Sequence, residues 1–90
     1  MAERIVAEPP YVEKLSELIR QKLGGATVEH EHVRGDRYRF IVVWEPFNTM
    51  DHPERQRLVW DLAESGLGKD LLKVTMILTL GTDDLPQDEA

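Results

Sequence analysis

The sequence predicts an α+β fold, a two-layer sandwich in which two helices cover one face of a three-stranded mixed sheet. Two amphipathic stretches and three β-forming stretches indicate this class, in the order helix, strand, strand, helix, short helical turn, strand. A chain of 90 residues has room for one hydrophobic core. We therefore expect a single domain over residues 10–82.

The first helix is expected over residues 10–23. Pro9 and Pro10 end any regular structure before it, and proline is favoured in the first turn of a helix. Apolar residues then recur at helical spacing: Tyr11, Val12, Leu15, Leu18, Ile19 and Leu23. Gly24 and Gly25 follow, and glycine is typical of a helix end.

Two strands joined by a turn are expected next. Residues 26–33 alternate weakly, which places two histidines on one face and two glutamates on the other. Residues 37–44, Arg-Tyr-Arg-Phe-Ile-Val-Val-Trp, are β-branched and aromatic and carry the strongest strand signal of the chain. The short link Arg34-Gly35-Asp36 contains glycine and aspartate, which favour a hairpin turn.

The second helix is expected to start at Asp51 and to end near Leu67. Asp51 followed by Glu54 is a helix-start pattern, and Pro53 is tolerated in the first turn. A short helical turn is expected after it. Residues 71–80, Leu-Leu-Lys-Val-Thr-Met-Ile-Leu-Thr-Leu, are rich in β-formers and predict the last strand.

This order of elements restricts the topology. The first two strands should pair as an antiparallel hairpin, and the last strand, which follows a helix, should lie parallel to residues 37–44 by a right-handed crossover. Residues 37–44 then form the central strand, in agreement with their apolar second half, Ile41 to Trp44. Both helices would cover one face, and the other face would be open to solvent or to a partner.

Composition excludes several classes of function. The chain has no cysteine, so it has no disulfide and no cysteine nucleophile. Its apolar runs are too short for a membrane span or a signal peptide, so we expect a cytoplasmic protein with no membrane contact. The net charge of −6 argues against general nucleic-acid binding. Four acids follow Thr82, and we expect residues 83–90 to be an acidic disordered tail and residues 1–9 a disordered N-terminus.

Two stretches give the chain a resemblance to the BolA-like family. Tyr-Arg-Phe-Ile-Val-Val-Trp-Glu-Pro-Phe-Asn-Thr-Met, residues 38–50, is similar to that family's aromatic residue, run of valines, short turn and buried phenylalanine. Pro-Glu-Arg-Gln-Arg-Leu-Val-Trp-Asp-Leu-Ala-Glu-Ser-Gly-Leu, residues 53–67, resembles its helix pattern. The likeness covers roughly residues 11–82 and implies a fold like that of the class II KH domain.

The resemblance also implies a role. BolA-like proteins typically pair with monothiol glutaredoxins, share a [2Fe–2S] cluster with them and act in iron handling, and some are linked to DNA binding and stress responses. Their cluster ligands are a histidine near the start of the last strand and a Cys or His between the first two strands. Here the last strand has Lys73 or Val74 at that place, and neither replaces an imidazole as an iron ligand. The family's helix histidine is Gln56 in this chain.

His30 and His32 are the candidate metal ligands. Residues two apart on a strand share a face, so both imidazoles could bind one metal ion. No third ligand is evident, because His52 lies before the second helix. The alternative is a pair of partly exposed histidines on an edge strand. In the resemblance they would be one half of a cluster site whose other half is absent.

The candidate surface for a partner or for nucleic acid is basic. It comprises Arg34, Arg37, Arg39, Arg55, Arg57, Trp60 and Lys73, which Lys69 could join. Acidic residues are interspersed with these, and the Gly-x-x-Gly loop of a nucleic-acid-binding KH domain is absent, so solvated charge is the alternative. Trp60 lies beside Arg57 and could anchor a partner, or pack on the core like Trp44.

No pattern of catalytic residues is evident. Ser16 and Ser65 lie in the expected helices with no histidine near them in the sequence, so an enzyme is not expected. The Arg-Gly-Asp tripeptide could be an adhesion signal, but turn chemistry accounts for it. We therefore expect a small BolA-like interaction module, an adaptor for a monothiol glutaredoxin in iron–sulfur or redox regulation. The alternatives are a KH-like nucleic-acid-binding or transcription-regulating protein, and a diverged domain without cluster ligation.

Overall fold

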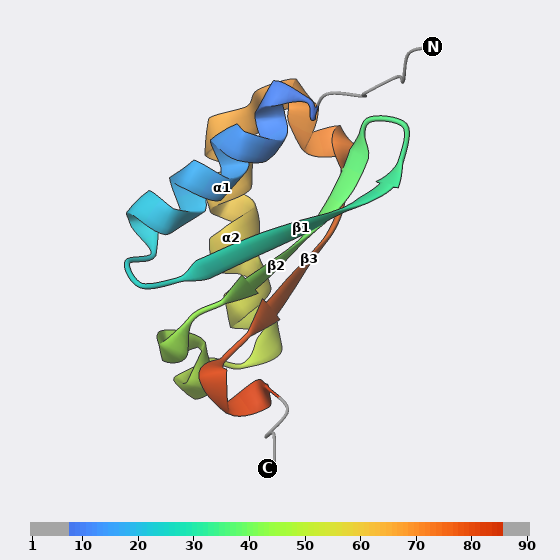
Figure 1. The fold of residues 1–90 in the computed structure, drawn as a ribbon. Helices are drawn as coiled ribbons and strands as arrows, with labels where there is room; N and C mark the ends of the chain where they lie inside the picture. The colour runs from blue at the N-terminus through green and yellow to red at the C-terminus, as the bar shows by residue number, and fades with distance from the viewer. Residues whose placement is uncertain (1–7, 86–90) are drawn as a thin grey trace.

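The computed structural model describes residues 8–85, and all structural statements refer to these residues. They form the expected two-layer α+β sandwich (Figure 1). The elements, in chain order, are α1 (Pro10–Lys22), β1 (Thr27–Arg34), β2 (Arg37–Val43), η1 (Glu45–Thr49), α2 (His52–Leu67), η2 (Gly68–Lys73), β3 (Val74–Leu80) and η3 (Thr82–Asp84), where η denotes a 3₁₀ helix. Within the described residues, no helix is long and apolar enough to cross a membrane.

The sheet has the expected topology. Its strand order is β1-β2-β3, with β1 antiparallel and β3 parallel to the central β2. α2 makes the crossover between β2 and β3, and both long helices lie on the same side of the sheet (Figure 1). The other face of the sheet carries no element of the described chain, so its side chains meet solvent.

The core lies between the helices and alternate residues of the strands. Tyr38, Phe40 and Val42 of β2 are buried, whereas the residues between them are exposed or half-buried. β3 adds Val74, Ile77 and Thr79 from the same face. The helical side of the core comprises Tyr11, Val12, Leu15, Ile19, Val59, Ala63 and Leu67. Phe47 is fully buried, as its place after the central strand predicted.

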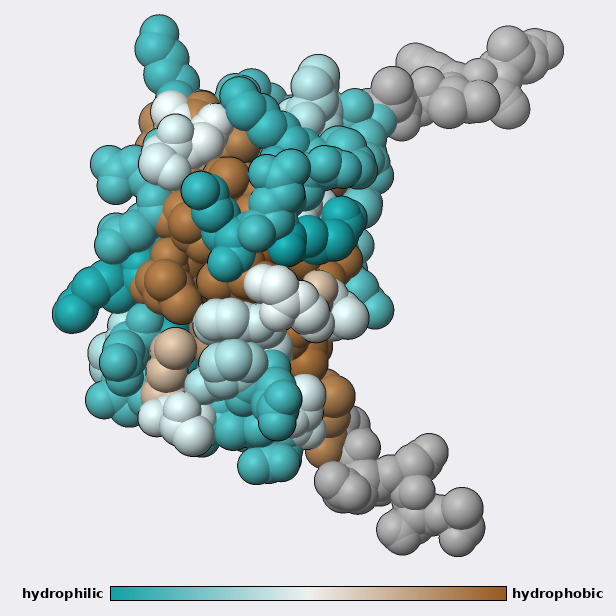
Figure 2. Space-filling model, turned by 90° about the vertical axis from the view of Figure 1, so that its left-hand side faces the viewer, coloured by the Kyte–Doolittle hydropathy of each residue, from teal (hydrophilic) through white to brown (hydrophobic). Residues whose placement is uncertain are grey.

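Helix boundaries follow from local chemistry. Asp51 caps α2, because its side chain accepts a hydrogen bond of 3.0 Å from the backbone N–H of Glu54. Pro10 and Pro53 each occupy the first turn of a helix, where no intrahelical N–H bond is lost. On the side of the molecule seen in Figure 2, hydrophilic side chains cover most of the surface and apolar residues show between them.

Several expected boundaries differ from the structure, most of them by one residue. The last strand begins at Val74, not residue 71, because residues 68–73 form η2 after Gly68, whose φ of 57° stops α2. The turn between β1 and β2 contains only Gly35 and Asp36, since Arg34 pairs with Arg37. The tail expected to be disordered from residue 83 is bound to the fold at Asp83 and Asp84, in η3.

The expected disordered N-terminus also differs where the structure describes it. Glu8 contacts His30, and Pro9 accepts a hydrogen bond of 3.1 Å from the backbone N–H of Val12. Residues 1–7 and 86–90 of the two expected disordered segments lie outside the described residues.

Candidate functional site

His30 and His32 share the face of β1 that is turned toward the helices. Each is opposite a buried aromatic residue of β2, His30 opposite Phe40 and His32 opposite Tyr38. The centroid of the Tyr38 ring lies 5.7 Å from that of His30 and 5.1 Å from that of His32. The expectation that the two histidines share a face is therefore confirmed, and both rings pack along the rim of the core.

The Nε2 atoms of both histidines already have partners. His30 Nε2 donates to the Glu8 carboxylate at 2.6 Å, and His32 Nε2 donates to the carbonyl oxygen of Gly35 at 2.8 Å. A ring nitrogen that carries a proton cannot bind a metal ion at the same time, so Nδ1 would have to serve. Among residues 8–85, no group of three or more His, Asp or Glu side chains is placed to hold a metal ion. A metal site at His30 and His32 stays a prediction.

The tip of the hairpin lies against the segment that leads into β3. Lys73 Nζ is 3.5 Å from a carboxylate oxygen of Asp36, in the turn, and 3.2 Å from one of Asp70. The buried hydroxyl of Tyr11 lies 2.7 Å from the carbonyl oxygen of Asp36 and 3.2 Å from that of Lys73. Its one proton can serve one acceptor at a time. The first turn of α1, the hairpin turn and the start of β3 thus meet at one point, which we call the tip site: Tyr11, His32, Asp36, Asp70 and Lys73.

The electrostatics of the tip site follow from these contacts. Hydrogen bonding and charge attraction to Asp70, with a further contribution from Asp36, raise the pKa of Lys73, so it is a firmly held cation. Burial raises the pKa of the Tyr11 phenol, since its ionised form would lose hydration. The tip site therefore has the ion pairs of Lys73 with Asp36 and Asp70 at its surface, and the neutral hydroxyl of Tyr11 beneath them.

Lys73 and Val74 are the two positions that could correspond to the last-strand histidine of the BolA-like pattern. Val74 is 6% exposed and pairs with Tyr38 in the core, so its side chain does not reach the surface. Lys73 is 41% exposed in its side chain and faces the hairpin turn. Of the two places that the sequence left open for the missing histidine, only that of Lys73 is partly exposed and faces the hairpin turn.

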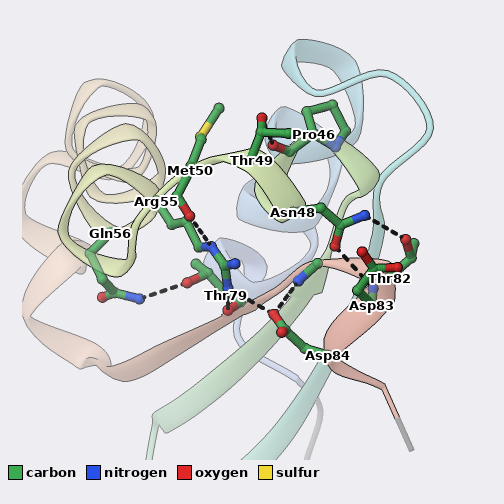
Figure 3. Close-up of polar contacts among 11 residues, drawn as sticks. Pro46, Asn48, Thr49, Met50, Arg55, Gln56, Thr79, Thr82, Asp83 and Asp84 are labelled. Carbon is green, nitrogen blue, oxygen red and sulfur yellow. Dashed lines mark hydrogen bonds and ion pairs between the residues drawn. The ribbon is translucent and has the colours of Figure 1, made fainter. Parts of the chain in front are cut away.

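Arg55 is largely bound within the fold, as Figure 3 shows. Its side chain is 14% exposed. Its guanidinium donates to the carbonyl oxygens of Met50 at 3.1 Å and Thr79 at 3.2 Å, and it forms an ion pair of 2.9 Å with Asp84. Arg55 thus joins the start of α2 to the end of β3, and little of it is left for a partner.

Gln56, at the place of the family's helix histidine, is also a structural link. Its amide nitrogen donates to the carbonyl oxygen of Ile77 at 2.9 Å and to the hydroxyl of Thr79 at 3.2 Å. Its amide oxygen accepts a hydrogen bond of 2.9 Å from the indole N–H of Trp60. Trp60 is half-buried against the core, which agrees with the packing alternative for this residue.

The remaining arginines do not gather in one patch. Arg34 and Arg37 lie opposite each other at the tip of the hairpin, and Arg39 bonds Glu31 on the open face of the sheet at 2.6 Å. Arg57 lies on α2, where it lines a shallow groove with Met50 and Leu58. The hairpin tip and the start of α2 are at opposite ends of the molecule (Figure 1). The basic set expected from the sequence is therefore divided between two ends.

The sequence did not indicate two kinds of residue at the tip of the hairpin: those that connect the tip site and exposed apolar ones. Tyr11, Asp36 and Asp70 hold the tip site together, but their separations in the chain give no signal of contact. Leu72, beside Lys73, is 84% exposed, and Val33, in the hairpin, is 49% exposed. Neither belongs to the core, so apolar surface accompanies the ion pairs of the tip site.

Comparison with known proteins supports the fold. No protein-family model matches the chain, and no curated protein matches it. Among solved structures, BolA1 from Arabidopsis thaliana is similar to it with a TM-score of 0.70 and 20% identity, over 84% of this chain and 96% of that one. The solution structure of the XC975 protein is similar with a TM-score of 0.56 and 21% identity, over 90% of this chain and 100% of that one. At such identities the likeness establishes a BolA-like fold.

Proposed function

We propose that this chain with a BolA-like fold is a small, non-enzymatic interaction module of the cytoplasm that pairs with a monothiol glutaredoxin in iron–sulfur or redox regulation. One observation carries the proposal. The hairpin turn and the start of β3 meet, with Lys73 Nζ 3.5 Å from Asp36. These are the two segments in which the resemblance places the cluster ligands, and their contact supports a site of similar layout with different residues.

The residues at the tip site do not fit a cluster held in the usual way. The last-strand position beside the hairpin is Lys73, a cation bound to Asp36 and Asp70, and an ammonium group offers no lone pair to iron. The next residue, Val74, is apolar and buried. We therefore propose pairing without a ligand from the last strand, which makes this chain a diverged member of the group that it resembles.

The exposed apolar residues support a protein partner. Leu72 is 84% exposed in η2, next to a charge network in which Lys73 is already neutralised by two carboxylates. Apolar side chains in the centre of an interface and polar ones at its rim are the usual arrangement of a binding surface. Leu72 would form the centre and Lys73, Asp36 and Asp70 the rim.

The test is a titration of the ¹⁵N-labelled chain with a monothiol glutaredoxin, once without and once with its cluster. We expect amide shifts in residues 33–37 and 68–74 in both titrations, and an unchanged visible spectrum of the cluster. Leu72→Glu should weaken binding about tenfold or more, as expected for an interface anchor. Leu85→Glu is the matched control, because Leu85 is an exposed leucine in another segment of the chain.

Two results would oppose this proposal. Absence of shifts in both titrations would remove the glutaredoxin as a partner. Shifts confined to α2 and η1 would place the contact at the other end of the molecule.

A second candidate function is KH-like binding of nucleic acid. Arg34 and Arg37 are paired across the end of the hairpin, where like charges repel unless an anion lies between them. A short DNA duplex added at low salt should then shift the amide signals of Arg34 and Arg37. The complex should dissociate at physiological salt. Arg34→Ala together with Arg37→Ala should abolish the effect, and Arg57→Ala should leave it unchanged.

A further inference from the structure

The two edges of the sheet differ in how many of their outward backbone groups are hydrogen-bonded by the rest of the fold. Leu80 directs its carbonyl oxygen to the backbone N–H of Trp44 at 3.0 Å, so the carbonyls of Thr79 and Ile77 point the other way, to the outer edge of β3. Both are bonded by α2, through Arg55 at 3.2 Å and Gln56 at 2.9 Å. Two carbonyls on the outer edge of β3 are thus bonded by side chains of α2.

The outer edge of β1 has no such cover. β1 is eight residues long, and within residues 8–85 no side chain or loop bonds its backbone from the outside. A long free edge exposes a row of N–H and C=O groups to which another strand can add. Within the described part of the chain, side chains of α2 thus cover part of one edge of the sheet, and the longer edge has no such cover.

A second copy of the chain is a poor occupant for this edge. Glu29 and Glu31 lie on the open face of β1, since the histidines between and beside them face the helices. If two β1 strands paired antiparallel about a two-fold axis, residues of the same face would be opposite each other. In the two registers that overlap β1 most fully, glutamate would then meet glutamate, and like charges in that position are destabilising.

A strand of opposite charge fits instead. We propose that the outer edge of β1 binds an extended segment of a partner protein by strand addition, with Lys or Arg at alternate positions. One basic residue would face Glu29, and the next would share the Glu31 carboxylate with Arg39 of β2. Backbone hydrogen bonds supply the affinity, and the alternate basic side chains supply the specificity. The net charge of −6 favours the approach of such a segment. This inference does not depend on pairing with a glutaredoxin at the tip site.

The experiment uses model peptides with the ¹⁵N-labelled chain at physiological salt. The probe is a blocked octapeptide of alternating lysine and threonine. Three comparison peptides separate the contributions: the same composition with all lysines at one end, alternating glutamate and threonine, and the alternating lysine peptide with N-methyl groups on two adjacent central residues. Adjacent N–H groups of an extended chain point to opposite edges, so the last peptide is blocked on both edges. We expect only the unmodified alternating lysine peptide to shift the β1 amides and to slow their hydrogen exchange.

Charge variants complete the experiment. Glu29→Lys should weaken the apparent Kd for the lysine peptide about five- to tenfold, because an attraction becomes a repulsion. Glu17→Lys, the same change at an exposed residue of α1, is the matched control and should alter the Kd by less than about twofold under salt screening. Equal binding of the peptide with grouped lysines would show mere charge attraction and overturn the proposal. Equal binding of the N-methylated peptide, or unchanged β1 amides, would overturn strand addition.

Discussion

The guanidinium of Arg55 lies 2.9 Å from the carboxylate of Asp84, 29 positions later in the sequence. The same carboxylate accepts a hydrogen bond of 2.8 Å from the backbone N–H of Gly81. Asn48 adds a second tie, because its side chain bonds the hydroxyl of Thr82 and the backbone N–H of Asp83 at 2.9 Å each (Figure 3). The segment after β3 is thus bound to η1 and to the start of α2, and this region should be sensitive to mutation.

Arg55→Ala should lower the free energy of unfolding by about 2–3 kcal/mol, the range expected when hydrogen bonds of a charged group are lost and buried carbonyls lose their donor. Arg55→Lys should cost about 1–2 kcal/mol, because an ammonium cannot reproduce the planar fork of the guanidinium. Urea unfolding followed by tryptophan fluorescence measures both. Arg57→Ala, two residues along and exposed, should stay within about 0.5 kcal/mol, and an equal loss there would contradict the assignment.

Stability should fall in acid through Asp84. The hydrogen bond from Gly81, followed by that from Arg55, holds the pKa of this carboxyl below its usual 3.8. A depressed pKa in the folded state gives stability that is present above the unfolded value and is lost as the pH falls through the folded one. Unfolding measured from pH 6 down to about pH 2 should therefore show a flatter loss below about pH 4 in Asp84→Asn than in the parent chain. Asp83→Asn, the same change at the neighbouring carboxylate, is the control.

Stability should also fall in alkali through Tyr11. Burial is the main cause that raises the pKa of its phenol above 10.0. A raised pKa in the folded state gives stability that is complete below the unfolded value and is lost as the pH rises through the folded one. Tyr11→Phe should remove the part of the alkaline loss due to this group, and at neutral pH it should cost about 1 kcal/mol for the hydroxyl contacts with Asp36 and Lys73. An unchanged alkaline limb in the variant would show that Tyr11 ionises as freely in the folded chain as in the unfolded one.

Lys73→His should restore an imidazole at the last-strand position beside the hairpin. If the tip site keeps the layout that the resemblance implies, this variant should change the visible circular dichroism of a cluster-loaded monothiol glutaredoxin, whereas the parent chain should leave it unchanged. Lys69→His, at an exposed position of the same 3₁₀ helix, controls for any added histidine nearby. Binding of Lys73→His without a spectral change would show that the tip site cannot direct an imidazole at the cluster.

Much of the fold could be predicted from local patterns. The helical spacing of Val12, Leu15 and Ile19 and the cap at Asp51 place both helices, and the hairpin signal places β1 and β2. The predicted start of β3 was wrong, because Leu71 and Leu72 continue the apolar run of the strand in the sequence. In the structure, residues 68–73 form a 3₁₀ helix that follows the positive φ of Gly68. Local propensity yields to tertiary packing at such places.

Less of the candidate site could be predicted. Alternation in β1 correctly placed His30 and His32 on a common face, but not that this face meets Tyr38 and Phe40. The contact of Tyr11 with Lys73 spans 62 positions, and nothing in either neighbourhood indicates it. Arginine in the sequence looks the same whether it is exposed, as Arg57 is, or enclosed, as Arg55 is. Only the three-dimensional packing decides which cations remain at the surface.

The hydrogen bonds from α2 to the outer edge of β3 affect the order in which contacts can form during synthesis on the ribosome. α2 is made before β3, so its Arg55 and Gln56 have no Thr79 or Ile77 carbonyl to bond until residues 74–80 have also left the exit tunnel. β2 likewise cannot form its parallel pairing until β3 is present, because Phe40 pairs with Ile77. A nascent chain that ends at η2 therefore lacks these contacts, and residues 74–80 complete the sheet and the core when they emerge.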